Sequence, residues 1–370
     1  MAVVVSIVPY KFLPPKIGGQ KGIALFNQYF SKYVQLVCLT INSNENQYAK
    51  GYEAIAVFPA SKFRYINLFA VFKLRRVIRE KKATHILIEH PYLGWMAFLL
   101  KKMTSTKLVV HSHNMEGLRF KTIGKWWWKL LWRYERFTHR HADYNFFIHE
   151  EDRQYAIKNF GLDEQKCIVV TYGIEIDSPP TQAEVQEAKA YVRKAHNILP
   201  GEKILLFTGS FNYKPNCDAF ENIDRIIASL LEQKGFACKI LICGPWLVSS
   251  QVTHPNVIIT GFVDDISIYF KAADIFINPT VEGGGIKTKL VEALGYNVNS
   301  VSTSNGAVGV DPSLCNGKLI VVEDNNWVAF AKNVIKISEV NADISLKYYE
   351  HFYWGYSTKK AAEFITQSSR

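Results

Sequence analysis

The sequence has no apolar run long enough to cross a bilayer, and its cysteines show no paired spacing. No stretch approaches the roughly 18 uninterrupted apolar residues of a membrane helix. The apolar start, MAVVVSIVPYKFLPP, has no positively charged leader and no small-residue cleavage site, which favours a buried first strand over a signal peptide. The scattered cysteines argue against a zinc site or a disulfide framework and are typical of a reducing cytosol: Cys38, Cys167, Cys217, Cys238, Cys243 and Cys315.

Low-complexity segments and tandem repeats are also missing, and the composition excludes wholesale disorder. Hydrophobic residues make up 48% of the chain and charged residues 21%, as in ordinary globular proteins. The charge is uneven, however. Residues 1–175 carry 26 Lys+Arg against 13 Asp+Glu, a net charge of +13, whereas residues 176–370 carry 18 against 20, a net charge of −2. The first half should therefore face an anionic partner: a nucleic acid, an anionic membrane surface or a phosphorylated acceptor.

The 370 residues predict two domains of α/β class. Short β-branched runs alternate with amphipathic stretches, which indicates parallel sheets wrapped by helices. We expect two Rossmann-like, doubly wound domains that face a central cleft, at 1–175 and 201–340. A linker at 176–200 includes a helix at 183–195, and a helical tail at 341–370 packs back toward the first domain. The expected strands are 3–8, 34–40, 53–58, 84–88, 108–111, 144–148 and 167–170, then 204–208, 238–242, 257–260, 275–278, 297–301 and 319–322.

Residues 281–295, VEGGGIKTKLVEALG, follow an expected strand and open an expected helix. Glycines let backbone N–H groups approach an anion, and the helix N-terminus adds a partial positive charge. Lys287 and Lys289 supply full charges, and Glu292 can accept two hydrogen bonds from a vicinal diol such as a ribose. The alternative is a glycine-rich turn with a surface ion pair. The other candidate contacts in this loop are Glu282, Gly284, Gly285 and Ile286.

Three further turns of the second half follow strands in the same way. FTGSFNYKPN at 207–216 brings Gly209, Ser210 and Lys214 to the end of a strand, and ICGP follows at 242–245. GFVDD at 261–265 contains Phe262 and Val263. Because ligands bind beyond the carboxyl ends of strands in open α/β sheets, four turns at one sheet edge predict a ligand site.

This series of motifs, in this order, resembles the donor-binding half of glycosyltransferase family 4, the glycosyl transferases group 1. In the first half, VVHSHNMEGLRF, WRYERFTHRHADYNFFIHEEDR and IVVTYGIE are similar to the acceptor half of the same family. The resemblance covers roughly residues 1–325. It implies the GT-B fold and a retaining transfer of sugar from a UDP- or GDP-type nucleotide sugar, with no cofactor and no metal.

The resemblance also assigns roles to residues. Glu292 matches the glutamate that holds the nucleotide ribose. Lys287 or Lys289, with Lys214, matches the positive charges on the diphosphate, and His113 matches the histidine beside the transferred sugar and the β-phosphate. The remaining assignments are Gly18 and Gly19 in a turn near the phosphate and acceptor, and Phe262 and Val263 near the base.

Two positions depart from the family pattern. In the E-x7-E pattern of many members, seven residues separate a first glutamate from the one matched by Glu292, whereas this chain has Gly284 at that first position and Glu282 two residues earlier. We expect the flexible glycine run to let Glu282 reach the sugar as a catalytic residue. Ser210 stands where many members have arginine, and Lys287 is expected to supply that charge. No Asp-x-Asp triplet lies in a suitable turn, which agrees with the absence of a metal.

Histidines outside the donor motifs also have interpretations that involve no catalysis. His111 is interpreted as a strand-end residue rather than a catalytic one. His90, in IEHPYLGW, either lines the acceptor cleft or caps a helix. His139 is expected to be solvated on a basic helix.

That basic helix is expected at residues 125–141. Winding it at about 100° per residue places Lys125, Lys129, Arg133 and Arg136 on one stripe, flanked by Trp126 and Trp132. The apolar side that should pack onto the sheet consists of Trp127, Leu130, Leu131, Tyr134 and Phe137. A basic stripe edged by tryptophan is typical of a helix at an anionic membrane surface; the alternative is a solvated basic face.

The sequence therefore predicts a cytoplasmic retaining glycosyltransferase, peripheral on the inner face of the plasma membrane. Its acceptor would be a glycan or a lipid-linked sugar in surface polysaccharide or lipopolysaccharide biosynthesis. A GT-B-fold nucleotide-sugar epimerase or hydrolase remains the alternative enzyme. A polyanion-binding protein is the non-enzymatic alternative, although no nucleic-acid-binding module is recognisable and no nucleic acid partner is expected.

Overall fold

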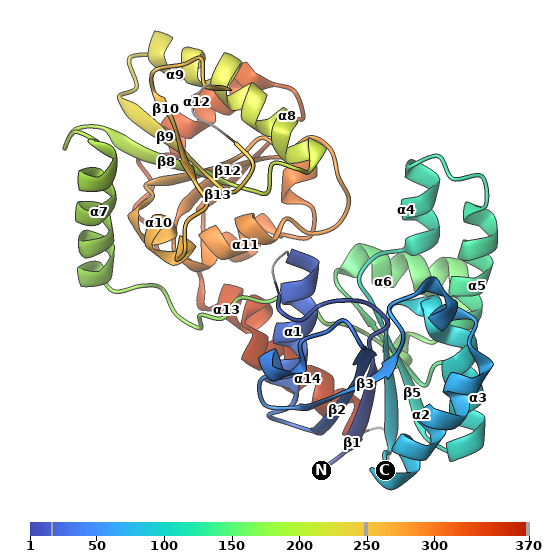
Figure 1. Cartoon of the computed structure of the whole chain (residues 1–370). Helices are drawn as coiled ribbons and strands as arrows, with labels where there is room; N and C mark the ends of the chain where they lie inside the picture. The colour runs from blue at the N-terminus through green and yellow to red at the C-terminus, as the bar shows by residue number, and fades with distance from the viewer. Residues whose placement is uncertain (16–17, 248–250, 368–370) are drawn as a thin grey trace. The chain divides into compact units, whose positions relative to one another are not determined.

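The computed structural model describes residues 1–15, 18–247 and 251–367, and the chain divides into two compact units (Figure 1). Unit 1 contains residues 1–173 and the C-terminal segment from Trp354 onward. Unit 2 contains residues 174–353.

Unit 1 is a seven-stranded parallel sheet with the order β3-β2-β1-β4-β5-β6-β7, covered by helices. Its strands are β1 (Val3–Ile7), β2 (Gln35–Ile41), β3 (Glu53–Phe58), β4 (His85–Glu89), β5 (Lys107–Ser112), β6 (Tyr144–Phe147) and β7 (Cys167–Val169). Its helices are α1 (Gly18–Phe30), α2 (Leu68–Glu80), α3 (Gly94–Thr104), α4 (Glu116–Thr122), α5 (Trp128–His141), α6 (Glu150–Ala156) and α14 (Trp354–Gln367). The strand order reverses between β1 and β4, so the loops after these two strands mark the expected ligand edge.

Unit 2 is a six-stranded parallel sheet with the order β10-β9-β8-β11-β12-β13. Its strands are β8 (Lys203–Thr208), β9 (Cys238–Cys243), β10 (Val257–Gly261), β11 (Ile275–Asn278), β12 (Asn299–Thr303) and β13 (Leu319–Val322). Its helices are α7 (Gln182–His196), α8 (Lys214–Asn222), α9 (Ala228–Gln233), α10 (Ile266–Ala272), α11 (Thr288–Gly295), α12 (Trp327–Ile337) and α13 (Leu346–Phe352). The reversal falls between β8 and β11. The prediction of two doubly wound parallel sheets is confirmed.

Residues 176–200, predicted as a linker, contain helix α7, which belongs to unit 2. Thr181 and Glu184 form a capping box at its N-terminus. Its inner face buries Ala188 and Val192 in the core of unit 2, and the helix packs against α10. The helix predicted at 183–195 is confirmed, and the two buried apolar residues on one of its faces join it to unit 2.

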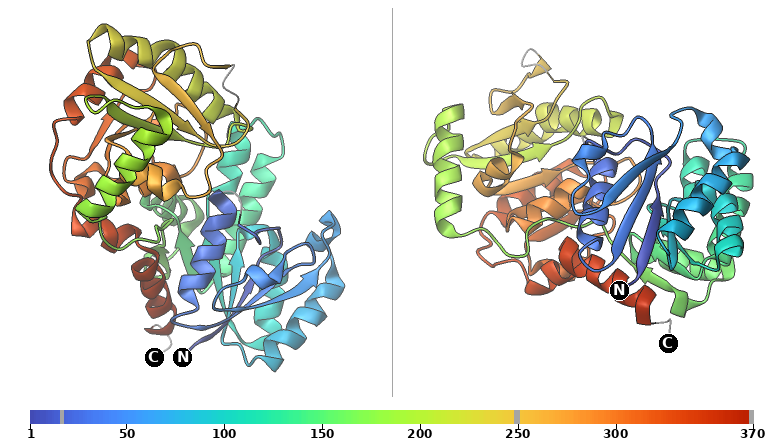
Figure 2. Two further views of the ribbon diagram at one scale, coloured as in Figure 1. Left: turned by 60° about the vertical axis from the view of Figure 1, so that its left-hand side comes forward. Right: turned by 60° about the horizontal axis from the view of Figure 1, so that its bottom comes forward.

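The end of the chain returns to unit 1, where α14 packs against α1 (Figures 1 and 2). The Tyr172 and Trp354 rings meet edge to face with centroids 5.5 Å apart. A Cβ on Gly173 would lie 2.4 Å from the Trp354 ring, so glycine lets the chain pass at this contact. The preceding helix, α13, packs within unit 2, and the last three residues of the predicted tail lie outside the described residues.

Helix α5 faces the core differently from the prediction. Its buried residues are Glu135, Thr138 and His139, whereas Leu130 is 71% exposed. Trp132, predicted on the edge of the basic stripe, points inward and donates from Nε1 to the Tyr155 hydroxyl at 2.9 Å. This face is buried because the Glu135 carboxylate accepts hydrogen bonds from the first backbone N–H groups of α4, which a helical wheel of apolar residues does not anticipate.

Among the described residues, no helix has the length and apolar character needed to span a bilayer.

His139, predicted to be solvated, is fully buried. Its Nδ1 lies 2.8 Å from Asn145 Oδ1, and its ring stacks on Phe147 and Phe160. Burial lowers the pKa of His139 to about 4. A proton on the ring would place a charge among aromatic side chains, so the folded state resists it.

Acid should therefore destabilise the protein through His139. The unfolded chain takes up this proton first, so the stabilisation is complete above the ordinary pKa of 6.5 and is lost as the pH falls toward 4. The loss amounts to at most about 3 kcal/mol. Urea unfolding at pH 7.5 and pH 5 measures it. His139→Gln should be less stable at pH 7.5 but lose less stability at pH 5 than the wild-type protein does; equal losses would contradict the assignment.

Candidate functional site

The four predicted turns of unit 2 lie at the carboxyl ends of its strands. Gly209 donates its backbone N–H to Cys243 O at 3.0 Å, and Gly244 donates to Gly261 O at 2.8 Å. A Cβ on Gly244 would lie 1.7 Å from Gly209 O, and its φ is +149°, so only glycine allows this approach. The loops after β8, β9 and β10 are thus joined into one backbone surface.

The loop between β11 and α11 contributes the next part of this surface. A Cβ on Gly283 would lie 2.7 Å from the Tyr213 hydroxyl, which places the loop against the start of α8. The Lys287 ammonium donates to Gly283 O at 2.8 Å and Gly285 O at 3.1 Å. Burial lowers the pKa of Lys287 to about 8. Lys287 therefore fixes the shape of the glycine loop, while Gly284 is exposed at its tip.

Glu292 lies on α11 and is mostly buried. Its Oε2 accepts a hydrogen bond from Lys289 Nζ at 2.7 Å, which makes the two side chains an ion pair. The structure thus brings together two of the predicted donor-site residues. Lys214 and Glu282 are both exposed, and Lys214 Nζ lies 3.9 Å from the Glu282 carboxylate. Lys214 also pairs with Asp218 on its own helix.

The remaining predicted donor residues differ in exposure. Phe262 is largely exposed, whereas Val263 packs against the core of unit 2 and Ile286 does the same. The Ser210 hydroxyl donates to Asn212 Oδ1 at 2.8 Å. Beneath the loop, a buried network that sequence reasoning missed fixes its base: Asn278 donates to Ser302, and Thr280 donates to Asn278.

In unit 1, Gly18 and Gly19 open helix α1 rather than sit in a turn before it, and both are exposed. His113 follows β5 and lies beside Glu89, the last residue of the neighbouring strand β4. His113 Nε2 and Glu89 Oε2 are 2.6 Å apart, and His111 Nδ1 lies 3.1 Å from the same oxygen. Burial works to raise the pKa of Glu89, but the charges and hydrogen bonds of His111 and His113 outweigh it and hold that pKa well below its usual range.

A second buried carboxylate lies beside this group. Glu116, at the start of α4, accepts from the Tyr92 hydroxyl at 2.5 Å and from Arg119 Nη1 at 2.8 Å. His90 Nδ1 is 3.5 Å from Glu116 Oε1, and its ring stacks on His113 with centroids 4.5 Å apart. Burial opposes ionisation, yet the hydrogen bond and charge of His90 contribute to lowering the pKa of Glu116 to about 2.

Glu89, His90, His111, His113 and Glu116 will be called the imidazole cluster. Three imidazole rings lie between two ionised carboxylates: the His90 ring stacks on His113, and the His111 ring is tilted against His113, each with centroids 4.5 Å apart. Because His113 Nε2 donates to Glu89, its Nδ1 is the nitrogen left for a bound molecule. His111, interpreted as a strand-end residue, is fully part of the cluster.

The cluster also contains a group that could hold a divalent ion. The ligand atoms of Glu89, His111 and His113 all lie within 4.8 Å of one another. Two imidazoles and a carboxylate suit Zn²⁺, although binding would require both histidines to give up the protons they share with Glu89.

Sequence reasoning missed Glu89 and Glu116. A signal was present for each: Glu89 ends the otherwise apolar strand HILIE, and Glu116 lies three residues after His113. An ionisable residue at the end of a buried strand needs a hydrogen-bonding or charged partner, and such pairs often lie at functional sites.

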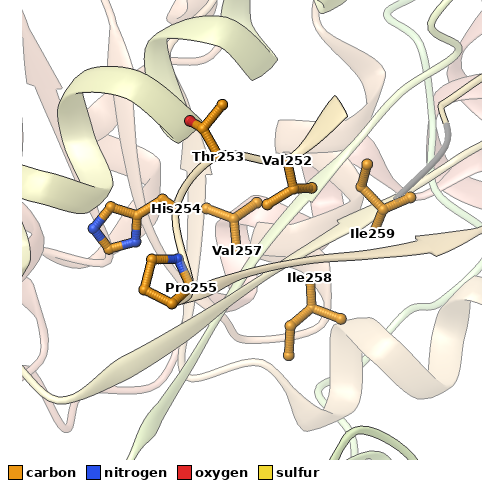
Figure 3. Close-up of a pocket in the computed structure, with 7 residues that line it drawn as sticks. All are labelled: Val252, Thr253, His254, Pro255, Val257, Ile258 and Ile259. Carbon is orange, nitrogen blue, oxygen red and sulfur yellow. The ribbon is translucent and has the colours of Figure 1, made fainter. Parts of the chain in front are cut away.

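A separate hollow in unit 2 is lined by residues 252–255 and 257–259, at the amino end of β10 (Figure 3). The Asp224 carboxylate accepts hydrogen bonds from the Thr253 and His254 backbone N–H groups. These contacts anchor the loop that leads into the strand. The hollow lies opposite the edge that carries the predicted donor residues.

The fold is that of GT-B glycosyltransferases, and the chain belongs to glycosyltransferase family 4. The sequence model described as Glycosyltransferase Family 4 matches residues 32–178, and that described as Glycosyl transferases group 1 matches residues 202–339. The prediction of the family is confirmed.

Particular relatives and solved structures are similar to this chain at low identity. A chitobiosyldiphosphodolichol beta-mannosyltransferase of Debaryomyces hansenii is 23% identical over 270 residues, which are 64% of this chain and 57% of that protein. The structure of Anabaena Alr3699/HepE in complex with UDP and glucose is 13% identical with a TM-score of 0.70, over 99% of this chain and 100% of that one. A lipopolysaccharide outer core galactosyltransferase, WaaB in its apo form, is 13% identical with a TM-score of 0.67, over 99% and 100%.

Proposed function

We propose that this glycosyltransferase moves a sugar, with retention, from a UDP- or GDP-type nucleotide sugar to a glycan or lipid-linked acceptor. The transfer would belong to surface polysaccharide or lipopolysaccharide biosynthesis and would need no metal. The names of two relatives support the acceptor class, since one name refers to a dolichol-linked glycan and the other to the lipopolysaccharide outer core. The complex of Alr3699/HepE with UDP and glucose supports the donor class.

The observation that carries the proposal is the loop of residues 279–287 with Glu292 behind it, at the strand-order reversal of unit 2. Glycine amides and the N-terminus of α11 offer hydrogen bonds to a diphosphate as it leaves. The Glu292 carboxylate offers two acceptors to a ribose diol, and Lys289 beside it adds positive charge. Stabilising the leaving diphosphate lowers the barrier because its negative charge grows in the transition state.

The role proposed for unit 1 rests on the imidazole cluster. Glu89 holds His113 by Nε2, which directs Nδ1 to the sugar or the β-phosphate. We propose His113 as a catalytic residue and Gly18 and Gly19 as backbone contacts at the start of α1. Glu282, exposed beside Lys214, remains a proposed sugar contact.

A thermal-shift panel of UDP-, GDP- and ADP-sugars tests the donor site. A ligand at 100 times its Kd should stabilise the protein by about 2.7 kcal/mol. No shift with any nucleotide sugar would contradict the proposal. Release of free nucleoside diphosphate only after an acceptor is added would exclude the epimerase or hydrolase alternative, and the anomeric configuration of the product, compared with the donor by NMR, tests retention.

We further propose that unit 1 binds the cytoplasmic face of an anionic membrane through the basic stripe of α5. Lys125, Lys129 and Arg133 are exposed, and Arg136 is half-buried above Trp132. Each basic residue near an anionic surface contributes about 1 kcal/mol, which salt screens. Trp126, in the turn before α5, is largely exposed.

Reversing two charges, Lys129→Glu with Arg133→Glu, should weaken binding to anionic vesicles at low salt by about 100-fold or more, because two attractive charges become repulsive. Co-sedimentation with vesicles at low and high salt measures this, with neutral vesicles as the control. The thermal shift by nucleotide sugar should not change, since that site lies in unit 2. Equal pelleting of variant and wild type would contradict a role for the stripe.

A further inference from the structure

Five large apolar side chains are exposed within ten residues of unit 1, at the short helical turn 62–65 and the start of α2. Their exposed fractions are Phe63 55%, Ile66 70%, Leu68 63%, Phe69 81% and Phe72 62%. Soluble surfaces commonly carry single exposed apolar residues, but a run of this kind marks an interaction site. We call these five residues the apolar ridge.

The core of unit 1 does not need the apolar ridge. Helix α2 buries Ala70, Val71, Leu74 and Ile78, a complete helical face at the usual spacing. The side chains of Leu68, Phe69 and Phe72 fall outside that face. The residues of the ridge therefore do not contribute to the core of unit 1.

The ridge is held in place rather than loose. The Asn67 side chain accepts from Phe69 N at 3.0 Å and caps α2. Trp95 Nε1 donates to Tyr65 O at 2.9 Å, and Arg64 donates to Pro9 O. A rigid ridge can present its apolar groups to a partner without a large ordering cost.

Charge around the ridge is mostly positive, although Glu80 at the end of α2 pairs with Arg76 at 2.7 Å. Residues 60–79 contain no Asp or Glu and six cations: Lys62, Arg64, Lys73, Arg75, Arg76 and Arg79. Apolar side chains ringed by lysine and arginine complement the interfacial layer of an anionic bilayer. The same cations would repel a second copy of this surface, and a nucleic acid would leave the apolar centre without a partner.

The ridge and the basic helix belong to the same layer of unit 1. Helices α2 and α5 both pack against α3. Leu130, on α5, is also largely exposed.

We propose that the apolar ridge inserts into the headgroup and upper acyl region of an anionic bilayer, while the basic residues bind its surface. This inference rests on the proposed membrane-linked acceptor and names the part of the chain that enters the lipid. Insertion gives a salt-resistant component of binding, in contrast to the salt-sensitive component from α5.

The test replaces Phe69 and Phe72 with serine together and measures co-sedimentation with phosphatidylglycerol/phosphatidylcholine vesicles. Burying one phenylalanine side chain is worth about one to two factors of ten in partitioning, so replacing the pair should weaken binding about 100-fold or more even at high salt. The matched control is Leu199→Ser with Val328→Ser, two comparably exposed apolar residues of unit 2. Because all four side chains are exposed, each variant should keep its unfolding temperature.

Equal vesicle binding of the ridge variant and the control variant would overturn the inference. A second result would also overturn it: light scattering that shows a dimer for the wild type and a monomer for the ridge variant, since the ridge would then bind a second copy. These outcomes leave the transferase function to its own test, because nucleotide-sugar thermal shifts and transfer to a soluble acceptor do not require the ridge.

Discussion

Replacing His113 with alanine should lower kcat about 100-fold or more, while the affinity for the nucleotide sugar stays nearly the same. The reason is that His113 is proposed to contact the sugar and the β-phosphate as charge develops, whereas the ribose and base are assigned to unit 2. Initial rates with saturating donor, together with donor titration by thermal shift, separate the two effects.

His141→Ala is the matched control, because His141 lies in the same unit, outside the imidazole cluster, with its Nδ1 on Phe137 O of its own helix. It should retain wild-type kcat. Normal turnover in His113→Ala would reduce His113 to a structural residue.

Glu89→Gln extends this test to the carboxylate that positions His113. The amide is neutral, so His111 and His113, which share one oxygen of Glu89, keep an acceptor but lose the negative charge that strengthens both contacts. We expect kcat between those of the wild type and His113→Ala, with unchanged donor affinity. A loss of donor affinity equal to the loss of kcat would indicate general damage to the fold.

Glu292→Ala should weaken nucleotide-sugar binding by about 2–4 kcal/mol, because charge-assisted hydrogen bonds to two hydroxyls are removed. That range corresponds to about 30- to 1,000-fold in Kd. Glu292→Gln, which keeps the shape without the charge, should fall between alanine and wild type. Calorimetric titration with the nucleotide sugar found in the panel measures all three proteins.

An exposed glutamate of the same unit, Glu187 on α7, supplies the control. Glu187→Ala should bind the donor like the wild type. Because Glu292 pairs with Lys289, Lys289→Ala distinguishes a lost ion pair from a lost ribose contact. Because Lys289 is also proposed to face the diphosphate, the comparison uses the nucleoside alone: equal weakening of nucleoside binding in Lys289→Ala and Glu292→Ala would show that the effect of Glu292 comes from the pair.

The sequence predicted the two parallel sheets well because buried strands are read from short apolar runs, and these runs are local. The error on α5 has a different cause. An apolar wheel assumes that the buried face is the apolar one, yet α5 buries Glu135 and His139, whose partners lie on α4 and β6. Polar burial depends on partners outside the helix itself, here 6 and 19 residues away, so the pattern of the helix alone could not identify it.

The same limit explains the candidate site. Loop 279–287 was found from its glycines because chain flexibility is a local property. The pairing of Glu89 with His111 and His113 was missed because it joins the ends of two strands 22 and 24 residues apart. Lys287 was assigned by its charge, but its contacts are the carbonyls of Gly283 and Gly285.

The return of α14 to the first unit has a consequence for how the protein is made. On the ribosome, residues 1–173 emerge first, but Trp354 and the rest of α14 leave the exit tunnel only after all of residues 174–353. Until then the surface of α1 that packs against α14, and Tyr172 with it, stays uncovered. The nascent first unit therefore exposes this apolar surface, which favours aggregation, while the second unit is synthesised. A stop codon before Trp354 would leave the first unit without its last helix.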